Sequence, residues 1–355
     1  MDKIKVGILG ATGLVGQRFI QLLENHPFFE VSAVAASSKS AGQTYAEAVK
    51  GRWKLETQIP ESVSGLVVRE CVPSSEDLVD CKIAFSALDA EIALGIERSF
   101  ADAGYAVCSN SKCHRMDPDV PLIVPEVNPE HLAIIPRQKK QRGSKGFIVT
   151  NPNCTTIGLV LALAPIHKRF GIKKIFVTTM QALSGAGYPG VTSLDILDNV
   201  IPYIGGEEEK IETETLKLLG KITGGDRFEY ADIKISAHCN RVAVKDGHLE
   251  CVSIGLEKKA TKEGLMKCIR EFNPLRGLNL PSAPHPPIII NEDDNRPQPR
   301  FDRDYGKGMA SCVGRIRKCN ILDWRLVLLS HNTIRGAAGA SILNAELLKA
   351  KGFVK

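Results

Sequence analysis

The strongest candidate for a reactive side chain is Cys154, one of ten cysteines in the chain. It lies in NPNCTT, residues 151–156, where a short apolar strand ends, a proline fixes a bend and a long helix follows. The free backbone N–H groups and the dipole at a helix start favour a thiolate. The same N–H groups could stabilise an oxyanion on a carbon bound to the sulfur. A buried structural cysteine is the alternative interpretation.

A nucleophilic cysteine needs a base, and His248 is the best placed of the eight histidines. The segment RVAVKDGH from Arg241 to His248 predicts a strand, a two-residue DG turn and a second strand. Such a hairpin would put both side chains on one face of a sheet, about 13 Å apart at ~3.3 Å per residue. One end of the space between Arg241 and His248 would hold the carboxylate of a small substrate, and the other end would hold its reacting carbon. A surface turn histidine remains the alternative, and His238 and His331 are weaker candidates.

A glycine-rich loop follows the first expected strand, residues 3–9. Gly10, Gly13 and Gly16 form GxxGxxG at the start of an amphipathic helix. These glycines permit a tight turn and let the backbone approach a pyrophosphate, which the helix N–H groups would bind. The pattern favours a dinucleotide site, and a purely structural turn is the alternative.

The end of the second expected strand, residues 29–36, bears on the choice of cofactor. An NAD site carries an acidic residue there for the ribose 2′-hydroxyl. This chain has Ser37, Ser38 and Lys39 instead, a set that suits a 2′-phosphate. We therefore expect NADP, with a serine-rich surface loop as the alternative.

Cys108, Cys113 and His114 have a spacing that invites a metal interpretation. No convincing second pair of ligands accompanies them, so the sequence predicts no metal site.

The order of expected elements indicates the fold class. Strands alternate with helices up to about residue 150, which predicts a Rossmann-type, doubly wound parallel sheet. From about residue 173 the segments alternate with period two and predict a mixed sheet in a second, α+β domain. We expect helices at 155–170, 199–220, 262–272 and 336–351, and loops at 136–146 and 281–300.

Length and composition restrict the class of protein. The 355 residues, 43% hydrophobic and 24% charged, are typical of a globular chain of two domains. There is no apolar run long enough for a transmembrane helix, and the N-terminus lacks a signal-peptide pattern. The net charge of +6 suits small anionic ligands better than nucleic acid. The basic loop 136–146 has no aromatic residues for base stacking. We expect reduced thiols, a cytoplasmic location and neither membrane nor nucleic-acid partners.

The chain resembles the aspartate-semialdehyde dehydrogenase family, in particular its archaeal and fungal branch. The matching stretches follow one another along nearly the whole chain: GILGATGLVGQRF at 7–19, SNSKCHRMDPDVPLIVPEVN at 109–128, NPNCTT at 151–156, QALSGAGYPG at 181–190, GEEEKIETETLKLLG at 206–220, CNRVAVKDGH at 239–248 and HNTIRGAAGA at 331–340.

The resemblance implies a role for individual residues. Cys154 is the nucleophile, His248 the acid and base, and Gln181 orients the intermediate. Arg241 binds the substrate carboxylate, and one of the consecutive Glu207–Glu209, assigned to Glu208, binds the amino group. The phosphate contacts are Arg115, Asn153 and Lys210. The residues implied at the cofactor are Gly10, Thr12, Gly13, Leu14, Val15, Gly16, Ser37, Ser38, Lys39, Ser86, Gly187 and Asn332.

The implied reaction is the reversible, NADPH-dependent reductive dephosphorylation of L-4-aspartyl phosphate to L-aspartate 4-semialdehyde through a cysteine thioester. It belongs to threonine and methionine biosynthesis. The alternatives are malonyl-CoA reductase, another acyl-phosphate or acyl-CoA reductase, and a silent NADP-binding sensor.

The resemblance also implies an organisation in domains and copies. Residues 1–153 form the NADP-binding domain, completed by the C-terminal helix 333–355. Residues 154–332 form the catalytic and dimerisation domain. We expect a homodimer or a dimer of dimers, with a small-molecule substrate and phosphate as the other partners.

Overall fold

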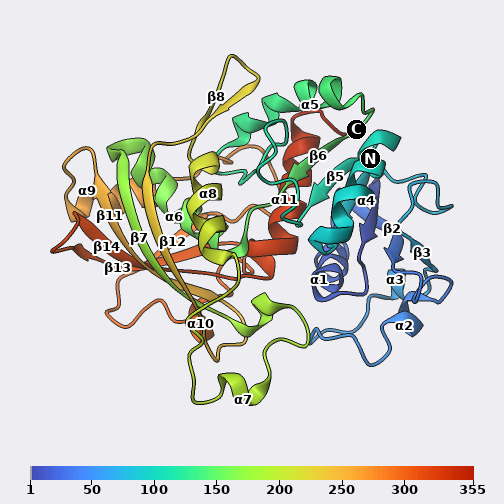
Figure 1. Cartoon of the computed structure of the whole chain (residues 1–355), viewed down its shortest axis with the longest axis horizontal. Coiled ribbons are helices and arrows are strands. Elements are labelled where there is room, and N and C mark those ends of the chain that lie inside the picture. The colour runs from blue at the N-terminus through green and yellow to red at the C-terminus, as the bar shows by residue number, and fades with distance from the viewer. Residues whose placement is uncertain (1) are drawn as a thin grey trace.

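The structure, a computed structural model, describes residues 2–355. The first part of the chain forms a six-stranded sheet in the order β3-β2-β1-β4-β5-β6, on the right of Figure 1. All of its neighbouring strands are parallel, as expected for a doubly wound sheet. Its strands are β1 (Ile4–Leu9), β2 (Phe29–Ala36), β3 (Val68–Glu70), β4 (Ile83–Ser86), β5 (Ala106–Ser109) and β6 (Phe147–Thr150).

Helices cover both faces of this sheet. On one face, Phe19 and Ile20 of α1 (Leu14–Leu23) pack with Leu343 and Leu347 of the C-terminal helix α11 (Gly339–Ala350). On the other face, Phe100 of α4 (Ala90–Ala103) packs in a second cluster. The end of the chain thus contributes to the core of the first sheet.

The second sheet is mixed, in the order β10-β7-β11-β14-β13-β12. One face packs against α6 (Cys154–Phe170), α8 (Glu207–Leu218) and α9 (Lys262–Arg270). The opposite face is open, with Phe176 44% exposed. The strands are β7 (Ile172–Gln181), β10 (Lys234–Arg241), β11 (His248–Leu256), β12 (Ile288–Asn291), β13 (Ser311–Lys318) and β14 (Trp324–Ser330). The predicted α/β class with a second, mixed-sheet domain is confirmed.

Three local expectations were wrong. The basic segment 136–146 is largely helical, as α5 (Ile135–Arg142), because Pro136 suits the first turn and Gly143 ends the helix at φ 65°. The expected helix 199–220 begins only at Glu207, after Gly206 at φ 69°. The proline-rich segment 281–300 contains β12, whose three isoleucines pair with β13.

The remaining elements are short: α2 (Tyr45–Ala48), α3 (Glu61–Ser64), η1 (Pro129–Ile134), η2 (Leu183–Ala186), α7 (Ser193–Ile196), β8 (Lys221–Thr223), β9 (Arg227–Glu229), α10 (Pro299–Asp302) and η3 (Ile334–Ala338). Across residues 2–355, no helix combines the length and the apolar character that crossing a membrane requires.

Candidate active site

Cys154 is the first residue of α6, as the sequence predicts. Asn153 caps this helix, and its Oδ1 accepts hydrogen bonds from the N–H groups of Thr155, at 2.9 Å, and Thr156, at 3.2 Å. These two N–H groups are therefore already bonded. The helix start therefore does not offer these two N–H groups to an oxyanion, because the preceding side chain satisfies them.

Three of the predicted side chains lie at one end of the second sheet, and one of them, His248, contacts Cys154. Gln181 is the last residue of β7, Arg241 the last of β10 and His248 the first of β11. Since β10 runs parallel to β7 and β11 runs antiparallel to it, these three residues lie at the same end of the sheet.

The predicted DG hairpin between Arg241 and His248 was wrong. Strand β7 lies between β10 and β11, and the connection passes over the end of β7. Two backbone hydrogen bonds fix that connection: Val242 N–H donates to Gln181 O, and Leu183 N–H donates to Val244 O. Both side chains still reach the same place, but through long-range pairing rather than a local turn.

The Cys154 Sγ lies 3.2 Å from Nε2 of His248. The Ala182 N–H donates to Nδ1 of the same ring at 3.0 Å, so the proton of the neutral imidazole is on Nε2, facing the sulfur. Burial lowers the pKa of His248 to about 3 and raises that of the Cys154 thiol to about 12. In this arrangement His248 is a hydrogen-bond donor; acting as a base requires that the Ala182 N–H first release Nδ1.

The other candidate histidines lie elsewhere. His238 is exposed on β10 and packs against the Phe176 ring. His331 is buried, with its Nε2 3.9 Å from Asp304. Neither is hydrogen-bonded to Cys154.

Gly185 covers the Arg241 and His248 side chains and was missed by the sequence reasoning. A Cβ at this position would lie 2.8 Å from Nη1 of Arg241 and 3.0 Å from Cε1 of His248. Only a residue without a side chain fits over both groups. The signal was present in the segment QALSGAGYPG, but the local sequence does not show which glycine makes the close contact.

We therefore expect Gly185→Ala to impair turnover without unfolding the protein. The added methyl group would displace Arg241 or His248, and displacements of about 1 Å at a reacting centre cost on the order of 10²-fold in rate. Steady-state kinetics and a melting curve would measure this. Gly95→Ala, at a helical glycine with open space around it, is the control and should leave the rate unchanged. A Gly185→Ala variant with the wild-type rate would contradict the prediction.

Glu207, not Glu208, faces the cysteine. Its Oε2 accepts hydrogen bonds from Nδ2 of Asn153, at 2.9 Å, and from Nε2 of Gln181, at 3.4 Å. Burial favours the neutral acid, but Lys210 and Asn153 outweigh it and lower the pKa of Glu207. Glu208 instead accepts from the Cys239 N–H at 3.0 Å and does not line the cavity, so the geometry favours Glu207 over Glu208.

Helical periodicity could have separated the two glutamates. Glu207 lies on the same helix face as the buried Ile211, one turn later, whereas Glu208 shares its face with Glu212, which caps a strand amide.

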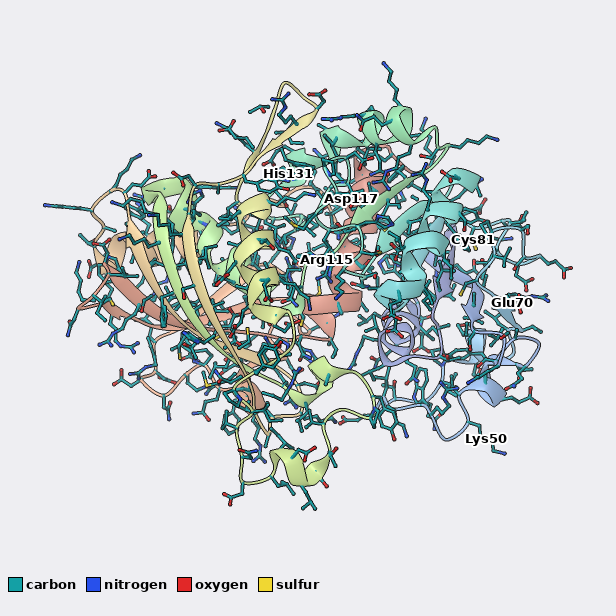
Figure 2. All side chains as sticks on the ribbon, in the orientation of Figure 1. Lys50, Glu70, Cys81, Arg115, Asp117 and His131 are labelled. Carbon is teal, nitrogen blue, oxygen red and sulfur yellow. The ribbon has the colours of Figure 1, made fainter. Side chains whose placement is uncertain are left out.

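The cations Lys112, Arg115 and Lys210 line the cavity around Cys154, which has a volume of about 460 Å³. Nζ of Lys210 lies 2.6 Å from Oε1 of Glu207. Arg115 donates from Nη1 to Glu214 and from Nη2 to the Asn110 carbonyl, while its buried Nε has no partner. Figure 2 shows Arg115 and Asp117 between α8 and the first sheet. The cavity thus combines a thiol with three cations, one of which, Arg115, has an unpaired donor.

A second cavity, of about 650 Å³, adjoins the first, and both are lined by Leu14, Gly187 and Thr333. At its margin the glycine loop makes the turn that the sequence predicts: Gly10 has φ 76°, and a Cβ on Gly16 would lie 2.3 Å from the Gly10 carbonyl. No side chain caps α1, so the N–H groups of its first turn are available to an anion. This arrangement fits a dinucleotide.

The candidate cofactor residues differ in whether the structure places them at the two cavities. Val15 and Asn332 line the cysteine cavity. Thr12 and Gly13 lie in the turn before α1, and Ser37, Ser38 and Lys39 are exposed just beyond β2. Ser86 ends β4 but is fully buried and lines neither cavity, so the structure does not bring it to the site.

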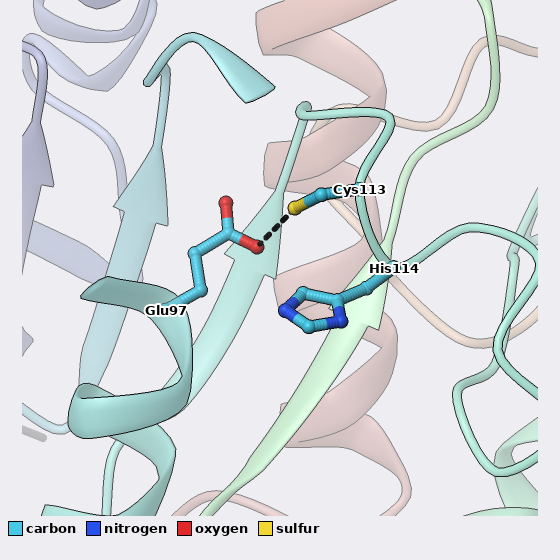
Figure 3. A group of neighbouring side chains, drawn as sticks. All are labelled: Glu97, Cys113 and His114. Atoms are coloured by element: carbon cyan, nitrogen blue, oxygen red, sulfur yellow. Dashed lines mark hydrogen bonds between the residues drawn. The ribbon is translucent and has the colours of Figure 1, made fainter. Parts of the chain in front are cut away.

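Glu97, Cys113 and His114 form a mixed cluster beside Arg115, shown in Figure 3. The Cys113 thiol lies 3.8 Å from Oε2 of Glu97, and Nδ1 of His114 lies 2.8 Å from Asp117. Burial lowers the pKa of His114, but Asp117, Cys113 and Glu97 together outweigh it and raise it to about 10. His114 therefore forms an ion pair with Asp117 around neutral pH.

Known protein families match both parts of the chain. Residues 5–135 match the family model of the semialdehyde dehydrogenase NAD binding domain, and residues 163–335 match that of the dimerisation domain. An aspartate-semialdehyde dehydrogenase from Archaeoglobus fulgidus is 52% identical over 346 residues, covering 98% of each chain. The chain belongs to the aspartate-semialdehyde dehydrogenase family.

Solved structures of the family agree. The chain is similar to the crystal structure of aspartate-semialdehyde dehydrogenase with NADP from Candida albicans, with a TM-score of 0.91, 47% identity and 99% coverage of both chains. It is also similar to aspartate-semialdehyde dehydrogenase II from Vibrio cholerae complexed with ASA, with a TM-score of 0.78, 28% identity and coverage of 99% and 100%.

Proposed function

We propose that the protein catalyses the reversible, NADPH-dependent conversion of L-4-aspartyl phosphate to L-aspartate 4-semialdehyde and phosphate. This reaction belongs to the biosynthesis of threonine and methionine. The observation that carries the proposal is the contact of 3.2 Å between Cys154 and His248, beside a cavity lined by Cys154, Arg115 and Lys210. The relatives named above support the same activity.

The first step forms a thioester. The thiol proton of Cys154 passes to Nε2 of His248, which requires that the Ala182 N–H has released Nδ1. Sγ then bonds to C4 of the acyl phosphate, and the C4–O bond breaks as phosphate leaves with its electron pair. A multiply charged phosphate enters a buried cavity only with cations beside it. Arg115 can bind it through parallel hydrogen bonds, Lys210 acts as a compact charge, and Asn153 is a neutral donor.

The amino-acid end of the substrate would be held on the other side of the cysteine. Arg241 binds the carboxylate, and Glu207 replaces Glu208 as the partner of the amino group. Gln181, hydrogen-bonded to Glu207, orients the intermediate. This assignment uses the carboxylate that faces Cys154 instead of the one that bonds to the Cys239 N–H within β10.

When bound, NADPH supplies the hydride that reduces the thioester carbon. The glycine loop from Gly10 to Gly16, the uncapped start of α1 and the exposed Ser37-Ser38-Lys39 would hold it. Nε2–H of His248 donates to the oxyanion on the carbon bound to Sγ. When the C–S bond breaks, its electron pair returns to sulfur and the aldehyde is released.

Arg115→Leu tests the phosphate assignment. In the oxidative direction, we expect it to raise the KM for phosphate by about 10- to 100-fold, because charge-assisted hydrogen bonds contribute about 1.5–3 kcal/mol. The KM for NADP should change little, since the proposed cofactor contacts are the glycine loop and the residues beyond β2, not Arg115. Arg241→Leu is the matched variant and should act mainly on aspartate semialdehyde. Unchanged phosphate dependence in Arg115→Leu, or equal oxidation without phosphate, would favour a hydrolytic aldehyde dehydrogenase.

The division into two domains and the formation of a homo-oligomer are part of the proposal. Residues 1–153 with 333–355 would bind the cofactor, and residues 154–332 would carry catalysis and dimerisation. The open face of the second sheet has a hollow of about 450 Å³ whose apolar lining includes Phe176, Ile321 and Leu322. Such a face suits a second copy of the chain. The cytoplasmic location expected from the sequence stays a prediction.

A further inference from the structure

One face of α8 carries four charged side chains toward the cysteine cavity and the loop beside it. Glu207 and Lys210 line the cavity. Glu214 and Lys217 follow at the spacing that keeps them on the same face, and both are buried, at 2% and 0% exposure. The proposed reaction uses the first pair and leaves the second without a role.

Lys217 holds the loop that carries Arg115. Its ammonium donates to three backbone carbonyls: Arg115 O at 2.7 Å, Val120 O at 2.8 Å and Asp117 O at 2.9 Å. These acceptors use all three N–H bonds of a charged ammonium. Burial lowers the pKa of Lys217 to about 7, although the nearby carboxylates oppose it. The three carbonyls therefore bond fully only to the protonated side chain.

Glu214 connects the same arginine to the start of the catalytic helix. Its Oε1 accepts from Nη1 of Arg115 at 2.9 Å, and its Oε2 accepts from the backbone N–H of Asn153 at 2.6 Å. One carboxylate thereby fixes the distance between the arginine and the residue directly before Cys154.

Stability alone does not account for this pair. Buried charges cost several kcal/mol of desolvation, and well-packed apolar residues often replace them without loss of stability. Here both charges bond to groups at the proposed phosphate position, from two separate segments of the chain. Their geometry defines where Arg115 and Asn153 lie relative to the sulfur.

We propose that Glu214 and Lys217 are positioning residues that hold Arg115 and Asn153 in register with Cys154 for phosphate binding. This inference rests on the proposed function, because it takes the phosphate site as the one described above. The two residues touch no substrate themselves and act through the groups that do.

The test compares Lys217→Met and Glu214→Gln with matched controls in the full-length protein. Lys168→Met removes another lysine that donates to a backbone carbonyl, Val127 O. Glu212→Gln changes another glutamate of α8, which caps the Ala237 N–H. The KM for phosphate, the KM for NADP and kcat would be measured in the oxidative direction with aspartate semialdehyde.

We expect the KM for phosphate to rise by about 10- to 100-fold in both positioning variants, with the KM for NADP within about twofold of wild type. The two controls should leave all three constants unchanged. In an Arg115→Leu background, Lys217→Met should raise the KM for phosphate no further, since its effect passes through Arg115.

The outcomes separate this inference from the proposed function. If Arg115→Leu raises the KM for phosphate and both positioning variants leave it unchanged, the inference is overturned and the function stands. If Arg115→Leu itself has no effect, the phosphate assignment fails. A fall in kcat together with equal rises in the KM for phosphate and the KM for NADP would indicate a merely structural role. This result would also overturn the inference. Should Lys217→Met not fold, Glu214→Gln, which keeps size and one carbonyl oxygen, decides alone.

Discussion

Cys154→Ser yields a folded protein that binds NADPH and has lost turnover by more than about 10³-fold, in the range seen when a covalent nucleophile is removed. The sulfur lies 3.2 Å from Nε2 of His248 and lines the cavity that Arg115 and Lys210 also line. Sulfur is both a strong nucleophile and a good leaving group, whereas a serine hydroxyl stays protonated near neutral pH. Rate assays in both directions and NADPH titration by fluorescence would measure the two effects.

Cys251→Ser is the control for the loss of a thiol elsewhere, because Cys251 is exposed on β11. It should retain the wild-type rate. If Cys154→Ser kept more than a few per cent of activity, Cys154 would not be the nucleophile, and the thioester step would have to be abandoned.

His248→Asn lowers kcat by about 10²- to 10⁴-fold, the usual contribution of a positioned proton donor or acceptor. The KM for phosphate should change little, because the imidazole bonds to the sulfur and is not one of the proposed phosphate contacts, Arg115 and Lys210. Stopped-flow and steady-state rates would provide kcat and KM separately. His238→Asn, at an exposed position on β10, is the matched control and should behave as wild type.

The pH profile adds a second readout for His248. Its pKa is lowered to about 3, so the free enzyme holds a neutral imidazole throughout the range from about pH 5 to 8. The profile of kcat/KM, which reports the free enzyme, should therefore lack an inflection from this residue. An inflection in that range that disappears in His248→Asn would show that the ring is charged before substrate binds, against the hydrogen bond from Ala182.

Local signals in the sequence determined much of the framework. The GxxGxxG loop and the helix start at Cys154 depend on backbone sterics and on an Asn153 cap within one turn. The parallel and mixed sheets follow from the alternation of strands with helices and from period-two patterns. Composition alone gave wrong predictions for two segments. The polar, basic residues of α5 and the prolines around the three isoleucines of β12 predicted loops, but these segments form a helix and a strand.

The tertiary structure alone decided how the site is assembled. Strand β7 between β10 and β11, Gly185 over Arg241, and Glu207 instead of Glu208 toward the cysteine all depend on contacts between segments far apart in the chain. The same holds for Lys217, which is 102 residues from Arg115, and for Glu214, which is 61 residues from Asn153. Patterns within a few residues report helix faces and strand alternation. They carry no information on which distant backbone carbonyl, amide or guanidinium a side chain will meet, because that is set by the packing of the two sheets and α8.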